Sequence, residues 1–118
     1  MRLSASILVT TGVLCCSPVA AQEGAGRGVG TTNCSQYGQL YKANPKVTEQ
    51  VFAAWAQGFM TGFNFSTVRE HHFRDMTAKT IEAQNEHIRL YCNAHPLASY
   101  VQAVLDFFAT LPDRPMTN

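Results

Sequence analysis

The stretch AAWAQGFMTGFNF, residues 53–65, constrains the fold of this chain more than any other segment. It is almost entirely apolar, as expected for a buried helix. Gly58 and Gly62 nevertheless lie four residues apart within it, and glycine inside a helix costs roughly 1 kcal/mol relative to alanine. The segment is therefore a membrane span, a hinge, or a helix that another element approaches closely.

On a helical wheel, large and small side chains of this segment fall on adjacent sides. The large ones form an aromatic ridge of Phe52, Trp55, Phe59 and Phe63. The small ones form a small-residue stripe of Ala54, Gly58 and Gly62. Small residues at this spacing let a second helix approach closely, so the stripe predicts helix packing, with another helix of this chain or with a second molecule. We then expect Gly58→Leu or Gly62→Leu to destabilise by overpacking.

The same helix is not expected to span a membrane. Gln57, Thr61 and Asn64 lie on its opposite face, and its apolar run is shorter than the ~20 residues that a span requires. A long apolar arc flanked by one polar side is typical of the central helix of a bundle.

Residues 1–21 have the pattern of a secretion signal. Arg2 precedes a short apolar run, and small residues before Gln22 suit cleavage. A lipid anchor on Cys15 or Cys16 is disfavoured, since neither follows a small residue. Removing 21 residues from 118 leaves 97, which is enough for a single domain. We expect this domain to be periplasmic or secreted. We divide it into a flexible Gly-rich leader (22–32), a helical domain (33–112) and a C-terminal tail (113–118).

Two cysteines, Cys34 and Cys92, remain after cleavage. In an oxidising compartment an isolated pair most simply forms one disulfide. The loop between them is long, so the chain-entropy model gives about 4 kcal/mol of stabilisation.

Helical spacing predicts four helices: over about 35–43, from Val47 or Thr48 to 64, from Thr77 or Thr80 to about 93, and over 97–111. Thr48 is the expected N-cap of the second helix, Asn44-Pro45 ends the first, and Pro96 suits the start of the fourth. The polar residues 66–76 are expected to form a loop. The fold class is thus all-α, a small four-helix orthogonal bundle stapled by one disulfide.

The residues argue against several functional classes. Pairing of the cysteines leaves no thiol nucleophile, and no H-E-x-x-H or other ligand spacing predicts a metal or cofactor. Adjacent His71 and His72 would point about 100° apart on a helix, so a solvated loop is the favoured interpretation over a metal site. Eight basic residues remain without Arg2, against eight acidic ones, so no nucleic-acid surface is expected. We expect a binding protein and not an enzyme.

Acid would strongly change the balance between positive and negative charges. At about pH 2–3 the carboxyls are protonated and the histidines charged, so the formal charge approaches about +12. Repulsion would loosen a small domain and expose its aromatic residues while a disulfide kept it compact. The side chains expected to sense pH are His71, His72, His87 and His95.

The order of these features resembles a known family. A cysteine begins the domain, a helix with WAQGFMTGFN follows, and a second cysteine opens YCNAHPLASYVQAV. Over Cys34 to about Phe108 this layout resembles the small periplasmic acid-stress chaperones of the HdeA/HdeB type. The resemblance implies a disulfide-linked four-helix fold, a homodimer near neutral pH, and acid-triggered binding of unfolded client proteins. It also implies that the ridge of Phe52, Trp55, Phe59 and Phe63 forms core or client-binding surface.

The resemblance is incomplete, because the segment between the second and third helices is unusually rich in histidine. A second resemblance, to immunity proteins of the Tai type, rests on the G-x-x-x-G helix and the A-H-P turn before an apolar last helix. It implies a protein that binds one specific toxin or enzyme partner at neutral pH. Those proteins usually carry more cysteines than this chain retains.

Overall fold

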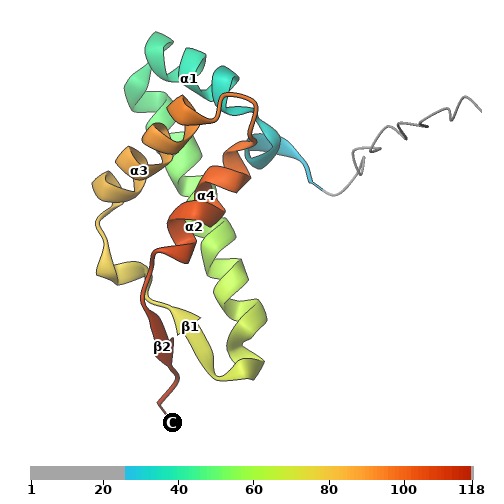
Figure 1. The fold of residues 1–118 in the computed structure, drawn as a ribbon, viewed down its shortest axis with the longest axis vertical. Coiled ribbons are helices and arrows are strands. Elements are labelled where there is room, and N and C mark those ends of the chain that lie inside the picture. Colours follow the sequence, from blue (N-terminus) through green and yellow to red (C-terminus); the bar gives the residue numbers. More distant parts are fainter. Residues whose placement is uncertain (1–25, 118) are drawn as a thin grey trace, which may run out of the picture.

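The computed structural model describes residues 26–117, and the predicted signal peptide, with the start of the leader, lies outside the described residues. The described chain forms the helices α1 (Cys34–Ala43), α2 (Pro45–Thr67), α3 (Ile81–Ala94) and α4 (Tyr100–Ala109) (Figure 1). Short 3-10 turns connect or extend them, and two short strands pair into a small antiparallel sheet. The all-α, disulfide-stapled fold predicted from the sequence is confirmed.

Polar side chains set the start of the helices, as capping theory requires. Asn33 Oδ1 accepts the Gln36 N–H at the start of α1, and Thr80 Oγ1 accepts the Ala83 N–H at the start of α3. Asn44 Oδ1 accepts the Val47 N–H of α2, directly before Pro45. The prediction of Thr48 as a cap was wrong: it is buried inside α2, and its hydroxyl donates to the Leu40 carbonyl.

The fourth helix begins three residues later than predicted. His95 to Ala98 form a turn closed by the Ala98 N–H to the His95 carbonyl, and α4 starts after Ser99. Leu97 is 95% exposed and contributes nothing to the apolar stripe. The Ser99 N–H donates to Gln102 Oε1 at 2.8 Å, which fixes the new start.

The core lies where α1, α2 and α4 meet. Tyr37, Phe52 and Tyr100 pack ring against ring, with centroids 4.8–5.2 Å apart. Burial raises the pKa of Tyr37 to about 12 and raises that of Tyr100 as well. The remaining buried apolar side chains are Cys34, Ala53, Ala56, Met60, Ile88, Cys92, Ala103, Val104, Phe107, Phe108 and Leu111.

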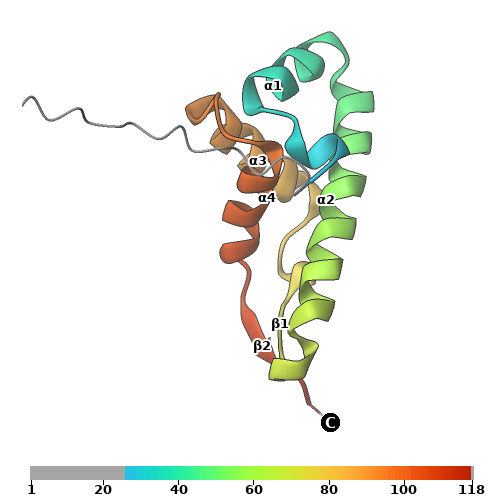
Figure 2. The same cartoon turned by 90° about the vertical axis from the view of Figure 1, so that its right-hand side faces the viewer.

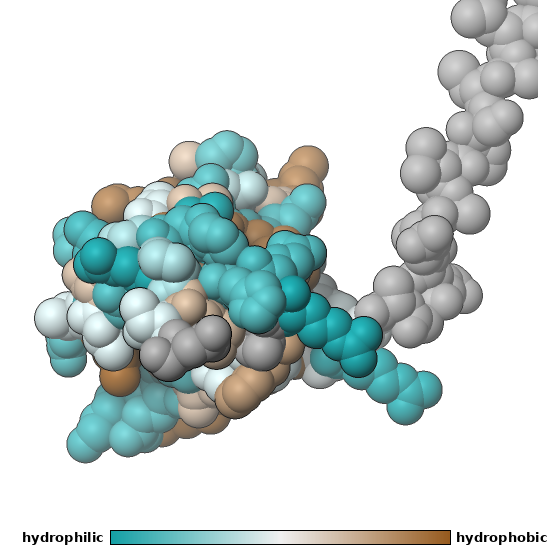
Figure 3. Space-filling model, turned by 90° about the horizontal axis from the view of Figure 1, so that it is seen from below, coloured by the Kyte–Doolittle hydropathy of each residue, from teal (hydrophilic) through white to brown (hydrophobic). Residues whose placement is uncertain are grey.

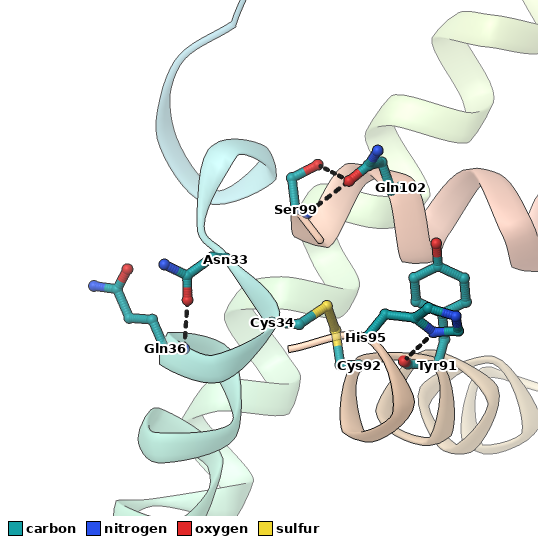
Figure 4. Close-up of a disulfide and its surroundings, with 8 residues drawn as sticks. All are labelled: Asn33, Cys34, Gln36, Tyr91, Cys92, His95, Ser99 and Gln102. Carbon is teal, nitrogen blue, oxygen red and sulfur yellow. Dashed lines mark hydrogen bonds between the residues drawn. A yellow bond between two sulfur atoms is a disulfide. The ribbon is translucent and has the colours of Figure 1, made fainter. Parts of the chain in front are cut away.

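The disulfide between Cys34 and Cys92 joins the start of α1 to the end of α3, as the sequence predicted. Backbone hydrogen bonds surround it: the Cys34 N–H donates to the Ala98 carbonyl and the Tyr100 N–H to the Thr32 carbonyl. Figure 4 shows the bridge between the two helices, with the turn into α4 beside it. This end of the fold is therefore tied covalently and by backbone hydrogen bonds.

The opposite end carries a two-stranded antiparallel sheet that the sequence did not predict. β1 (His72–Arg74) pairs with β2 (Asp113–Pro115), in the register Phe73 opposite Arg114. The predicted loop is therefore partly a strand, and the predicted tail folds back onto it. Figure 2 shows the two strands alongside the last turns of α2.

The predicted leader is also partly structured. Gly28–Thr31 form a 3-10 turn, η1, which contacts α2 and α4. Gly30 is buried against Trp55, where an added Cβ would lie 2.2 Å from the indole. The folded domain thus begins at about residue 28 and not at residue 33. Among the described residues, no helix is both long and apolar enough to cross a membrane.

Candidate interaction site

The aromatic ridge runs from the core to the surface. Phe52 is buried and touches Tyr37 and Tyr100, so it could meet a partner only if the core opened. Trp55 stacks on Phe59 at 5.1 Å and 13°, and η1 covers part of its indole. Phe63 is 43% exposed and packs edge-on against Phe108 of α4. Only the Phe63 end of the predicted binding ridge is substantially open.

The small-residue stripe does not pack against another helix of this chain. Ala54, Gly58 and Gly62 are exposed, and a Cβ placed on either glycine meets no atom within 4 Å. The intramolecular form of the packing prediction, including overpacking by Gly58→Leu within one chain, was therefore wrong. The wheel placed the stripe correctly beside the ridge, but the neighbouring helices pack only on the ridge side.

The ion pairs of the described residues each join two separate parts of the fold. Glu49 of α2 pairs with Arg89 of α3 at 2.6 Å, and His87 of α3 meets Asp106 of α4 at 2.8 Å. Within the two-stranded sheet, His72 of β1 meets Asp113 of β2 at 3.3 Å. A fourth pair joins Arg114 to Asp75 at 3.5 Å. Every pair contains a carboxylate, whose protonation in strong acid removes the negative charge of the pair. The two pairs that contain a histidine carry a positive charge only when that histidine is protonated.

Hydrogen bonds within its own segment also stabilise the charged form of Asp75. Its Oδ1 accepts the hydroxyl and the backbone N–H of Thr77. These hydrogen bonds, with a smaller contribution from Arg114, hold the pKa of Asp75 below its ordinary value. Its carboxylate therefore keeps its charge to lower pH than an isolated one.

The four histidines are not brought together. His71 lies in the turn before β1 with φ of 58°, and His72 follows it as the first residue of β1. The His87 ring lies against Phe107 at 5.5 Å. His95 stacks on Tyr91 near the disulfide and its Nδ1 is 3.0 Å from the Tyr91 carbonyl (Figure 4). Within residues 26–117 no cluster of three His, Cys, Asp or Glu side chains is arranged to hold a metal.

An apolar hollow lies between the end of α2 and the two-stranded sheet. Its volume is about 280 Å³, and its lining consists of Thr61, Asn64, Phe65, Phe73, Met76 and Met116. A more polar hollow of about 380 Å³ adjoins it and contains His72, Asp113 and Phe108 in its wall. Figure 3 views the molecule from this end, where hydrophobic residues emerge among hydrophilic ones. The sequence did not predict this hollow, because the hollow forms only when the two strands pair. Strands of three residues are too short to show the alternating pattern that predicts a strand.

No family model, curated protein or solved structure matches this chain.

Proposed function

We propose that this chain is a non-enzymatic binding protein of the periplasm or cell exterior, and most specifically an acid-activated holdase. The observation that supports the proposal is the contrast between its two kinds of crosslink. The disulfide between α1 and α3 is indifferent to acid, whereas the ion pairs between elements all depend on a carboxylate. Acid therefore loosens the contacts between elements and leaves the covalent tie.

The position of α4 indicates which surface acid would uncover. The ion pair between His87 and Asp106 is one tie of α4 to α3, and the aromatic ring of Phe107 lies beside it. On the other side, Phe108 covers Phe63 of the ridge. Displacement of α4 would expose both rings together with the ridge, an apolar surface suited to unfolded clients.

Isolated surface ion pairs stabilise folded proteins only weakly, so their loss alone would not open the domain. The change in total charge adds to it. The formal charge of +1 for the whole chain becomes strongly positive in acid, and like charges then repel across a small domain. Protonation of the carboxylates contributes to both effects, so both act in the strongly acidic range.

The test is suppression of client aggregation. A client that precipitates at pH 2–3 is mixed with a severalfold molar excess of the protein and followed by light scattering, with the same mixture at pH 7 as the control. We expect suppression at low pH and little at pH 7. Equal aggregation with and without the protein at low pH would refute the holdase proposal.

A second candidate, an immunity or inhibitor protein with one specific partner, is favoured by the apolar hollow between the end of α2 and the two-stranded sheet. That hollow is lined by apolar side chains and is open in the folded domain, with no need for acid. This candidate predicts a stoichiometric complex at pH 7 that Met76→Glu weakens. The holdase predicts instead that Met76→Glu leaves neutral-pH behaviour unchanged.

A further inference from the structure

Two methionine side chains lie at the same apolar hollow. Met76, in the 3-10 turn η3 (Met76–Ala78), and Met116, just after β2, both belong to its lining, together with Phe65 and Phe73. The third methionine of the described residues, Met60, is 1% exposed in the core. Two of these three thioethers are therefore gathered at one opening of the surface, and only one serves the packing of the core.

The pairing of the strands fixes the backbone at both methionines. The Met116 N–H donates to the His71 carbonyl at 2.8 Å, and the Asp75 N–H, directly before Met76, donates to the Pro112 carbonyl at 2.9 Å. These hydrogen bonds extend the pairing of β1 and β2, which run side by side at this end of the molecule (Figure 1). The backbone is held in place, while the rotatable bonds of methionine let each thioether adapt to the hollow.

The sulfurs at the hollow differ from that of Met60 in their access to solvent. Met116 is 42% exposed and Met76 is half-buried, whereas Met60 is enclosed. Oxidation to the sulfoxide requires contact between the oxidant and the sulfur, and it converts a flexible apolar side chain into a polar one. A dissolved oxidant can therefore reach Met116 and Met76, and not Met60, as long as the domain stays folded.

The surroundings of Met76 also suit its oxidised form. The Thr61 hydroxyl donates to Met76 Sδ at 4.0 Å, across the gap between α2 and η3. The hydroxyls of Ser66 and Thr67, further along α2, donate instead to carbonyls of their own helix. A thioether is a weak acceptor, and a sulfoxide oxygen is a strong one. The hydroxyl of Thr61 thus gains a better partner when Met76 is oxidised.

We propose that Met116 and Met76 form an oxidation site for hypochlorous acid, which makes the wall of the hollow polar while the domain stays folded. In each reaction one oxygen atom is added to a sulfur, and the sulfide loses two electrons. Chlorine takes up these electrons and leaves as chloride, and one proton is released. Methionine sulfoxide reductases reverse this kind of modification, with one enzyme for each epimer.

Oxidation would control which partners the hollow accepts. In the reduced state its lining is apolar, so it suits an apolar side chain or ligand, and two sulfoxides would oppose such contacts. The disulfide at the other end of the fold is already oxidised and is buried, so the same reagent leaves it in place. The proposal involves neither acid nor an unfolded client, and it stands or falls separately from the holdase assay.

The first experiment maps the oxidised sites. Processed protein at pH 7 receives up to about three molar equivalents of hypochlorous acid and is then digested with trypsin for mass spectrometry. Met60, Met76 and Met116 fall in separate peptides, 47–69, 75–79 and 90–118. We expect Met116 to be oxidised first, then Met76, and Met60 at least about tenfold more slowly, with unchanged ellipticity at 222 nm.

The same titration in urea is the control, because unfolding should make the three methionines react alike. Oxidation of Met60 as fast as that of Met116 and Met76 in folded protein would overturn the proposal. So would a loss of ellipticity at the stage when only Met116 and Met76 carry oxygen, since the modification would then damage the fold.

The second experiment tests the contribution of Thr61. Thr61→Val keeps the shape of the side chain and removes the hydroxyl. We expect oxidation to lower the melting temperature by less than about 2 °C in the wild type and by about 4 °C or more in Thr61→Val. Adding Met76→Leu to Thr61→Val should abolish this extra loss. Equal losses in the wild type and Thr61→Val would contradict the proposed accommodation of the Met76 sulfoxide.

Discussion

Asn64 holds the backbone of Arg74 with both ends of its side-chain amide. Its Nδ2 donates to the Arg74 carbonyl at 2.9 Å, and its Oδ1 accepts the Arg74 N–H at 2.8 Å. The guanidinium of Arg74 in turn donates to the Leu111 carbonyl, just after α4. These contacts connect the end of α2, the strand β1 and the end of α4.

Asn64→Ala should therefore cost about 1–3 kcal/mol, since it removes two partly buried hydrogen bonds at once. Urea denaturation followed at 222 nm measures the loss. Asn93→Ala, at an exposed position near the end of α3, is the control and should change stability by no more than about 0.5 kcal/mol. Equal losses of stability in the two variants would show that the hydrogen bonds between Asn64 and Arg74 contribute little.

Gly30→Ala should displace η1 from the core. The new Cβ would lie 2.2 Å from the indole of Trp55, so either the turn or the ring must move. Trp55 is the only tryptophan in the sequence, and its fluorescence should shift to the red as water gains access. Gly38→Ala meets nothing within 4 Å in α1 and should instead stabilise by up to about 1 kcal/mol. An unshifted spectrum in Gly30→Ala would mean that η1 does not cover the ring in solution.

Reduction of the Cys34–Cys92 bridge should lower stability by about 4 kcal/mol, the value expected for a closed loop of this length. The two cysteines are separated by 58 residues, and both are buried at the junction of α1 and α3. Thermal unfolding with and without a reductant, at pH 7, measures the difference. If the reduced protein were as stable as the oxidised one, the disulfide would contribute little to the stability of the domain.

Strong alkali should unfold the domain through its buried tyrosines. The folded-state pKa of Tyr37 is raised by burial, to about 12, and that of Tyr100 is raised too, relative to ~10 in an unfolded chain. The resulting stabilisation is complete below about pH 10 and is lost as the pH rises towards the folded-state values. Absorbance at 295 nm should show fewer tyrosines ionising near pH 10 in folded protein than in urea. If all titrated near pH 10 in both states, the tyrosines would not be buried.

The sequence was sufficient for the features set by local chemistry. Helical spacing placed the four helices, Asn44-Pro45 separated the first two, and Cys34 and Cys92 were paired correctly. Features that depend on distant partners were missed. The two strands, His72–Arg74 and Asp113–Pro115, are too short to show an alternation of apolar and polar residues. They form because their backbone groups hydrogen-bond to each other and, at Arg74, to the side chain of Asn64.

The small-residue stripe illustrates the same limit. The wheel shows which residues share a face of α2, but it does not show on which sides the neighbouring helices pack. Gly58 and Gly62 look like a packing groove in the sequence and lie at an exposed face in the fold. The same limit applies to the histidines, since His72 and His87 meet their carboxylate partners only through tertiary contacts.

A pH titration of apolar exposure tests whether acid opens the domain as proposed. The carboxylate of Asp75, with its lowered pKa, stabilises the fold fully above about pH 4, and this contribution is lost as the pH falls through the lowered value. Fluorescence of the dye ANS and near-ultraviolet circular dichroism are recorded on oxidised protein from pH 7 to pH 2. We predict that ANS binding rises and the near-ultraviolet signal falls below about pH 4, while helical ellipticity at 222 nm is largely kept. ANS and near-ultraviolet signals at pH 2 that equal those at pH 7 would refute the proposed acid response.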